Sequence, residues 1–232
     1  MRTRKSLRIG LTLLGCLGTA LTLGACSHKP AESEAAAPAG QPDTPLIQAA
    51  ASGDAGAIRQ QLAQGADPNA KGQGGGTALL AAVQSGSLPA VSALLSSKAD
   101  VNAADDSGQT PLILAARANR AQIAKALLDK GARPDAVQAG QTALMIAIDQ
   151  GHTDIVKLLL AHGANVNAKG TDGRTVLQYA IYRNDVPTVK ALLAHGADVN
   201  AKGDFNGTPL HTALKLKRAA LADLLKKAGA KD

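Results

Sequence analysis

Short apolar stretches and short polar stretches alternate along the chain from residue 44 onward, with a period close to 33 residues. A Thr opens each unit, a Leu follows two residues later, and an Ala follows five residues later. Because residues three apart share one side of a helix, the Leu and the Ala predict a short helix with one buried face. The opening residues are separated by 33, 33, 32, 33 and 33 positions: Thr44, Thr77, Thr110, Thr142, Thr175 and Thr208.

A second apolar stretch in each unit, with paired Leu residues in most units, predicts a second helix. Thr is a favourable N-cap for the first helix, and three of the Thr residues precede a Pro, which fits the first helical position. Gly-Ala ends most units, and the loop that follows is expected to form a hairpin-like finger. Residues that tolerate a left-handed backbone stand nine positions after the Thr: Gly53, Gly86, Asn119, Gly151 and Asn184.

Three departures from the repeat predict local irregularity within the same fold. Lys98 replaces the Gly that ends most units, which costs about 1 kcal/mol if its φ angle is positive. Lys217 replaces the Gly or Asn between the last two helices, and the loop at 132–141 is one residue short.

The segment Thr208-Pro209-Leu210-His211-Thr212-Ala213 resembles the signature of ankyrin repeats, and the period of 33 residues agrees with that family. The resemblance implies an all-α ankyrin-repeat solenoid of six helix–turn–helix repeats over residues 43–232, with hairpin-like finger loops. Since no single unit can bury its apolar face alone, neighbouring units must stack. The resemblance also implies a monomeric, non-catalytic scaffold that binds a protein on its concave surface.

The N-terminal segment predicts an export signal. Four basic residues lie within positions 1–8 and no charge follows over 9–25, as in a secretory signal peptide. Leu23-Gly24-Ala25-Cys26 resembles a bacterial lipobox, so residues 1–25 are assigned as a lipoprotein signal peptide and Cys26 as the lipidation site. An uncleaved anchor helix is the alternative.

Residues 26–42 are read as the lipidated Cys and a flexible tether, because no apolar side chain larger than Ala follows Cys26 in this range. The resemblance to lipoproteins implies a membrane-anchored chain that faces the periplasm. Ser27, rather than Asp, favours the outer membrane over the inner one.

The charge balance changes once the signal is removed. The chain has 25 Lys and Arg against 18 Asp and Glu, a formal net charge of +7. Four of the basic residues lie in the signal, which leaves a net charge of +3. With only three aromatic residues to stack on bases, nucleic acid is not an expected partner.

The repeats offer little for catalysis or metal binding. They contain neither Glu nor Cys, and most Asp residues stand at turns or helix starts. His162 and His195 occupy equivalent sites 33 residues apart, too distant to share one zinc ion. The Gly-rich segment 72–76 falls at a finger tip and lacks the sequence of a phosphate-binding loop. No catalytic residue, metal ligand or cofactor is predicted.

Residues four and seven positions after each Thr are expected to face the groove. Leu114, Ile146 and Tyr179 are predicted to form an apolar stripe over three repeats. Tyr179, Tyr182 and Phe205 are the only aromatic residues and lie close together in the repeat pattern. Because aromatic and Arg side chains commonly anchor interfaces, two Arg residues join the aromatic and apolar residues in the predicted protein-binding set. This set comprises Leu114, Ile146, Arg174, Tyr179, Tyr182, Arg183 and Phe205.

The sequence thus favours a lipid-anchored scaffold that captures a periplasmic protein of unidentified nature. A related hypothesis is that the protein is an accessory or inhibitory subunit of a periplasmic enzyme. A small-ligand or cofactor carrier that uses His and Tyr residues of the last three repeats stays open, and an enzyme is the least favoured class. The basic residues of the last repeat are read as a solvated cap, with a basic binding patch as the alternative.

Overall fold

The computed structural model describes residues 43–203 and 207–231, and these residues form twelve short α-helices, one 3-10 turn and one two-stranded hairpin. The predicted signal peptide, Cys26, the tether up to residue 42 and Phe205 lie outside the described residues. Within the described part of the chain, no helix combines the length and the apolar character needed to cross a bilayer.

The first helix of every repeat begins directly after the predicted Thr. Each Thr hydroxyl oxygen accepts a hydrogen bond from the backbone N–H three residues later, at 3.1–3.3 Å. The six first helices are α1 (Pro45–Ala51), α3 (Ala78–Ser85), α5 (Pro111–Arg117), α7 (Ala143–Gln150), α9 (Val176–Arg183) and α11 (Pro209–Lys215).

The second helices are nine residues each, too short to be stable alone in water, so their stability depends on packing between repeats. They are α2 (Ala55–Ala63), α4 (Leu88–Ser96), α6 (Ala121–Asp129), α8 (Thr153–Ala161), α10 (Val186–Ala194) and α12 (Ala219–Lys227).

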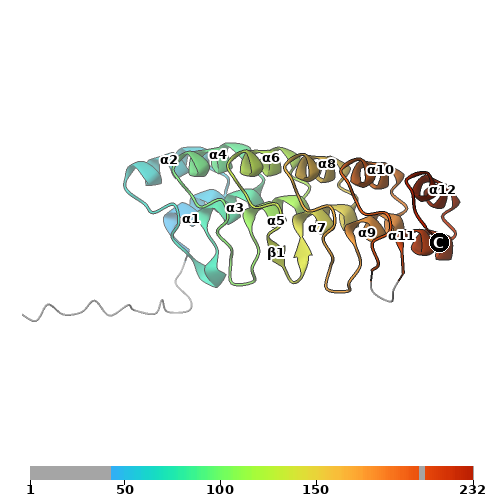
Figure 1. Ribbon diagram of the computed structural model, residues 1–232. Coiled ribbons are helices and arrows are strands. Elements are labelled where there is room, and N and C mark those ends of the chain that lie inside the picture. The colour runs from blue at the N-terminus through green and yellow to red at the C-terminus, as the bar shows by residue number, and fades with distance from the viewer. Residues whose placement is uncertain (1–42, 204–206, 232) are drawn as a thin grey trace, which may run out of the picture. The chain divides into compact units, whose positions relative to one another are not determined.

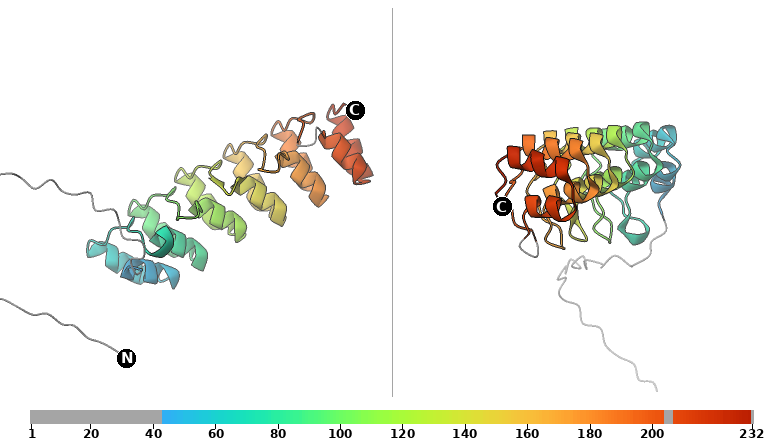
Figure 2. Two further views of the ribbon diagram at one scale, coloured as in Figure 1. Left: turned by 90° about the horizontal axis from the view of Figure 1, so that it is seen from below. Right: turned by 90° about the vertical axis from the view of Figure 1, so that its right-hand side faces the viewer.

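The helices stack in two layers. Each first helix packs against the first helices of the neighbouring repeats, and the second helices from α2 to α10 do the same. Figure 1 shows the row of second helices above the row of first helices, with the fingers projecting beyond the first helices, and Figure 2 shows the same stack from two further sides. We call the side formed by the first helices and the fingers the inner face. The predicted all-α stack of six repeats is confirmed.

The core lies between successive repeats. The Leu two positions after each Thr is at most 2% exposed in all six repeats. The side chain six positions after the Thr is fully buried in the first five repeats, where the next repeat covers it, but the equivalent Leu214 of the last repeat is 50% exposed. Burial at this position therefore depends on a following repeat.

The short loop at 132–141 closes as a tight hairpin. Strand β1 (Val137–Gln138) pairs antiparallel with β2 (Gln141–Thr142), with Val137 opposite Thr142. Ala139 and Gly140 between them have φ angles of 48° and 77°, as a two-residue turn of type I′ requires. Longer fingers close with a single bridge, such as Lys169 with Thr175. The missing residue thus converts this finger into a regular β-hairpin.

Positive φ angles occur where the repeat pattern predicted them. Asn119 and Asn184 have φ angles of 53° and 59° between their two helices. Lys217, at the same position of the last repeat, has 55°, and Lys98 has 64°. These two Lys residues therefore carry the strain of a left-handed backbone that Gly would avoid.

An Asn side chain joins most neighbouring repeats and was not predicted in that role. The amide of Asn167 donates to the Gly196 carbonyl at 3.4 Å, and its oxygen accepts the Asp198 N–H at 2.8 Å. We call this pair of bonds the Asn clamp. It recurs at Asn69, Asn102 and Asn200.

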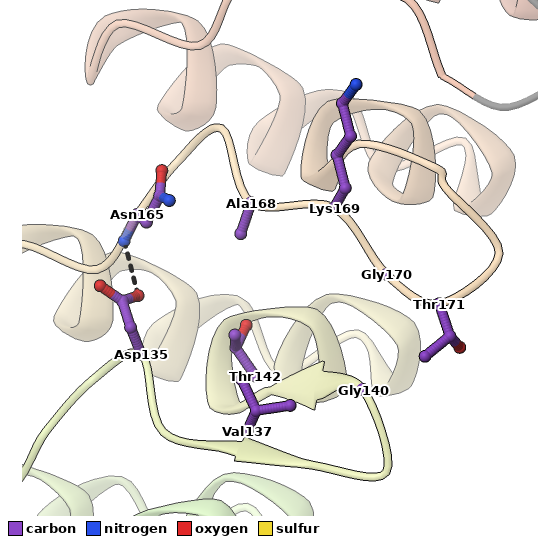
Figure 3. Close-up of a pocket in the computed structure, with 9 residues that line it drawn as sticks. All are labelled: Asp135, Val137, Gly140, Thr142, Asn165, Ala168, Lys169, Gly170 and Thr171. Atoms are coloured by element: carbon purple, nitrogen blue, oxygen red, sulfur yellow. Dashed lines mark hydrogen bonds between the residues drawn. The ribbon is translucent and has the colours of Figure 1, made fainter.

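The fourth repeat receives only half of a clamp. Asp135 stands at the clamp position and accepts the Asn165 N–H at 2.8 Å (Figure 3). An ionised carboxylate has no hydrogen to donate, so Asp135 cannot make the second bond of the clamp.

Candidate protein-binding surface

Most of the predicted polar and aromatic interface residues belong to α9 and the finger before it. Thr175 and Gln178 form a capping box at the start of α9: the Thr hydroxyl accepts the Gln178 N–H at 3.2 Å, and the Gln178 oxygen accepts the Thr175 N–H at 3.0 Å. These two hydrogen bonds fix where the finger ends and the helix begins. It thereby sets the positions of Arg174, just before the helix, and of Tyr179 and Tyr182 along it.

A chain of four side chains connects the finger to α9. The Tyr179 hydroxyl donates to Asp172 Oδ1 at 2.7 Å, and Asp172 Oδ2 lies 3.2 Å from Arg174 Nη1. The Arg174 guanidinium in turn lies over the ring of Tyr182, 4.3 Å from its centroid. Such a stack combines cation–π attraction with flat packing. We call these four residues the Tyr–Asp–Arg–Tyr chain.

The Tyr–Asp–Arg–Tyr chain has a half-buried end at Tyr179 and an exposed end at Tyr182. Tyr179 is partly buried against the core, whereas Tyr182 is 42% exposed. Burial, and then the hydrogen bond to Asp172, raise the pKa of Tyr179 to about 12. Its hydroxyl is therefore protonated at neutral pH and can donate to Asp172, which orients the carboxylate toward Arg174.

Close packing at the finger supports this arrangement. Gly170 lies so near the Tyr179 hydroxyl that an added Cβ would overlap it. A side chain at this position would displace Tyr179 or the finger. Gly170 therefore provides the space that the hydrogen bond to Asp172 needs.

A polar cleft of about 290 Å³ lies beside the exposed end, between α9 and α11. Its wall includes Arg174 and Tyr182 from the fifth repeat, and His211 and Lys215 from the sixth. We call the less exposed lining residues, Gln178, Gly207 and Thr212, the floor of the cleft. The cleft lies on the inner face.

Comparison with known proteins shows to which family this chain belongs. The family model for ankyrin repeats in three copies matches four overlapping stretches, residues 46–138, 108–170, 135–203 and 169–232. This chain belongs to the ankyrin-repeat family. The search of curated proteins found no match.

Two solved ankyrin-repeat structures are similar over most of the chain. An ankyrin repeat domain from Acinetobacter baumannii is 33% identical with a TM-score of 0.77, and the similarity covers 81% of this chain and 98% of that one. The ankyrin repeat domain of human ASB11 is 30% identical with a TM-score of 0.69, over 82% and 85% of the two chains. Ankyrin repeats are generally protein–protein interaction modules and are typically non-catalytic.

The predicted apolar stripe has less surface than expected on this ankyrin stack. Leu114 and Tyr179 are partly buried against the core, and Ile146 is only 4% exposed. Ile146 lies in the middle of the stack, where α5 and α9 pack on both sides of α7. The expectation that it forms part of an exposed stripe is therefore wrong, and the accessible inner face depends more on Tyr182 and the charged residues.

Arg183 lies apart from Arg174. Arg174 precedes α9, whereas Arg183 is its last residue, and the Arg183 guanidinium lies beside Gly151 at the turn between α7 and α8. The two cations are thus at opposite ends of one helix. Phe205, the remaining aromatic residue of the predicted patch, lies outside the described residues.

Two residues of the surface were not identified from the sequence in their present roles. Asp172, one of the Asp residues that the sequence predicts at turns, joins Tyr179 to Arg174. Gln178 caps α9, and its amide group donates to the Gly207 carbonyl at 2.9 Å. The Thr-x-x-Gln spacing could have revealed the cap, but the bond to the next repeat required the three-dimensional stack.

Three of the His side chains make hydrogen-bond contacts to protein groups. Nδ1 of His162 and of His195 lies 2.9 Å from a carbonyl one turn back in its own helix, and Nδ1 of His152 lies 2.9 Å from the Ala116 carbonyl of the preceding repeat. Over residues 43–203 and 207–231, no three His, Cys, Asp or Glu side chains are grouped so that they could hold a metal ion.

A second hollow, of about 420 Å³, lies between the β-hairpin finger and the following loop (Figure 3). Backbone turns and Gly residues form much of its wall, together with Val137, which is 58% exposed. Figure 3 shows the Lys169 side chain pointing away from Val137 and Thr142. The hollow therefore lacks converging charged groups, in contrast to the cleft beside Arg174.

Proposed function

We propose that the protein is a lipid-anchored scaffold that captures a periplasmic protein on the inner face of its ankyrin repeats. The observation that carries the protein-binding part is the exposed Tyr182 ring under the Arg174 guanidinium, next to the cleft between α9 and α11. Rigid aromatic and Arg side chains are frequent anchors of protein interfaces.

The anchoring part rests on the sequence of the N-terminal segment. A basic start, an uncharged apolar stretch and Leu23-Gly24-Ala25-Cys26 support lipidation at Cys26. More than one acyl chain anchors a protein stably, and confinement to a membrane raises the local concentration of whatever the repeats bind. Ser27 favours the outer membrane over the inner one.

Crosslinking in cells tests the binding surface. A photo-crosslinking amino acid in place of Tyr182 should yield a discrete crosslinked protein, because this side chain is exposed on the inner face. The matched control places the same amino acid at Lys190, which is exposed on the second helix α10. A discrete product at Lys190 and none at Tyr182 would move the binding surface to the outer layer.

Labelling with palmitate tests the anchor separately. The Cys26→Ser variant should lose the label, whereas Cys16→Ser should retain it, because the lipobox resemblance is at Cys26. Label that persists in Cys26→Ser would show that this site is wrong. A visible absorption band in the purified chain would favour the small-ligand carrier instead of the scaffold.

A further inference from the structure

The cleft between α9 and α11 has a distinct chemical character that narrows what a partner must offer. Its wall brings together the side chains of Arg174, His211, Lys215 and Tyr182. Among the described residues that line it, there is no Asp or Glu. Arg and Lys can only donate hydrogen bonds, so this wall presents donors and positive charge to the space between the helices.

The floor of the cleft is already satisfied by bonds within the protein. The Gln178 amide nitrogen donates to the Gly207 carbonyl at 2.9 Å and to the Thr212 hydroxyl at 3.3 Å, and the Thr212 hydroxyl donates to the Thr208 carbonyl at 3.0 Å. These polar groups hold the fifth and sixth repeats together. Recognition of a ligand therefore falls to the wall residues, and above all to Arg174 and Lys215.

Arg174 is held in place before any ligand arrives. Its guanidinium lies over the Tyr182 ring and one of its nitrogens contacts Asp172, which the Tyr179 hydroxyl anchors from the other side. A side chain that is ordered in advance loses less entropy on binding. Asp172 occupies one edge of the guanidinium fork, and such a fork has five N–H donors in all.

The charge at the equivalent position differs between repeats. Seven residues after the Thr, the third repeat has Arg117, the fourth has Asp149, the fifth has Tyr182 and the sixth has Lys215. An acid in place of Lys215 would repel an anion. The cationic cleft therefore depends on residues that vary from repeat to repeat and does not follow from the ankyrin pattern.

We propose that this cleft binds the carboxylates of an acidic segment on the protein partner. This inference rests on the proposed scaffold function and adds the chemistry of the partner at the point of contact. Charge complementarity carries it: a wall of donors and cations favours carboxylates, and a segment with several Asp or Glu residues can engage Arg174 and Lys215 together.

Binding of a defined acidic peptide to the full chain, purified in detergent, tests the inference. The probe is fluorescent hexaglutamate with blocked ends, and the neutral control is the equivalent hexaglutamine. We expect hexaglutamate to bind and hexaglutamine not to bind. Lys215→Gln and Arg174→Gln should each weaken binding about tenfold, the effect of losing one charge-assisted hydrogen bond. The matched control Lys190→Gln, at an exposed Lys on α10, should leave binding unchanged.

Three results would overturn the inference. These are equal affinity for hexaglutamate and hexaglutamine, unchanged affinity in both Lys215→Gln and Arg174→Gln, and displacement of the peptide by inorganic phosphate at the same concentration of charge, which would indicate a site for free anions.

Crosslinking at Tyr182 separates this inference from the scaffold function. A partner that the crosslinking residue at position 182 captures equally well with and without Lys215→Gln supports the scaffold but overturns the acidic segment. Failure of capture in both, with hexaglutamate still bound through Lys215, overturns the scaffold and leaves the cleft chemistry in place.

Discussion

Two regions of the repeats differ in how much their residues vary: the loops after the second helices are nearly constant, whereas the inner face is variable. At the clamp position, four of five loops have Asn, and the remaining loop has Asp135. On the inner face, the residue seven positions after the Thr differs in every repeat: Ala51, Gln84, Arg117, Asp149, Tyr182 and Lys215.

The physical reason for this difference is the neighbour that each side chain meets. A clamp residue must match backbone groups of the next repeat, and these have the same geometry at each step of the stack. An inner-face residue meets solvent or a partner, so its identity is not constrained by the fold. The recurring clamp residues therefore stabilise the stack, whereas the variable inner-face residues are free to serve recognition of a partner.

The largest effect should come from the buried side of a first helix. Leu144→Ala removes a side chain that is 0% exposed between neighbouring repeats and should reduce the free energy of unfolding by about 2–5 kcal/mol. Leu114→Ala, at a partly buried site of the inner face, is the control and should cost clearly less. Urea unfolding measures both, and equal losses would remove the distinction between core and face.

Breaking a clamp should have a smaller effect. Asn167→Ala removes one bond to Gly196 and one to Asp198 and should cost about 1–2 kcal/mol, from two bonds of modest net value. Asp135→Asn is the counterpart, because it adds the missing donor to the half clamp and should increase stability by about 0.5–1 kcal/mol. Unchanged unfolding midpoints in both variants would mean that the clamps add nothing.

Relief of backbone strain should give a gain of about the same size. Lys98→Gly places Gly at a φ angle of 64° and should stabilise the protein by about 1 kcal/mol. Lys130→Gly is the matched control, since Lys130 has a φ angle of −99° and Gly there adds only flexibility. The thermal midpoint should rise in the first variant and fall in the second; a fall in both would argue against strain at Lys98.

The remaining effect appears only at alkaline pH and concerns the pKa of Tyr179. The chain has two Tyr residues, so Tyr182→Phe leaves Tyr179 as its only phenol, and phenolate absorbance should show a transition near pH 12. The ordinary Tyr pKa is about 10. Because the folded value is raised, the associated stability is complete below pH 10 and is lost as pH rises toward 12.

A double variant supplies the control for this titration. Tyr179→Phe combined with Tyr182→Phe has no phenol and should not lose stability through this window by this route. A transition near pH 10 in the Tyr182→Phe protein would mean that burial and the bond to Asp172 do not act on Tyr179 in solution.

The sequence supported accurate prediction of the repeats because each one is a local pattern. Thr N-caps, early Pro residues and the residues at positive φ act within a few positions of themselves, so their spacing alone predicts where helices begin and end. Even the one-residue shortening at 132–141 was visible, although its outcome as a hairpin depended on the turn at Ala139 and Gly140. The lipid anchor at Cys26 stays a prediction.

By itself, then, the sequence determined the six-repeat stack, the positions of its helices and the family. Only the tertiary structure decided which inner-face residues meet solvent and which groups meet across repeats: Ile146 is buried, the Arg183 guanidinium lies beside Gly151, and the Gln178 amide donates to the Gly207 carbonyl. The reason is that exposure and side-chain contact depend on the volume and position of neighbours that lie 29–36 residues away in the chain. Spacing within one repeat does not contain that information.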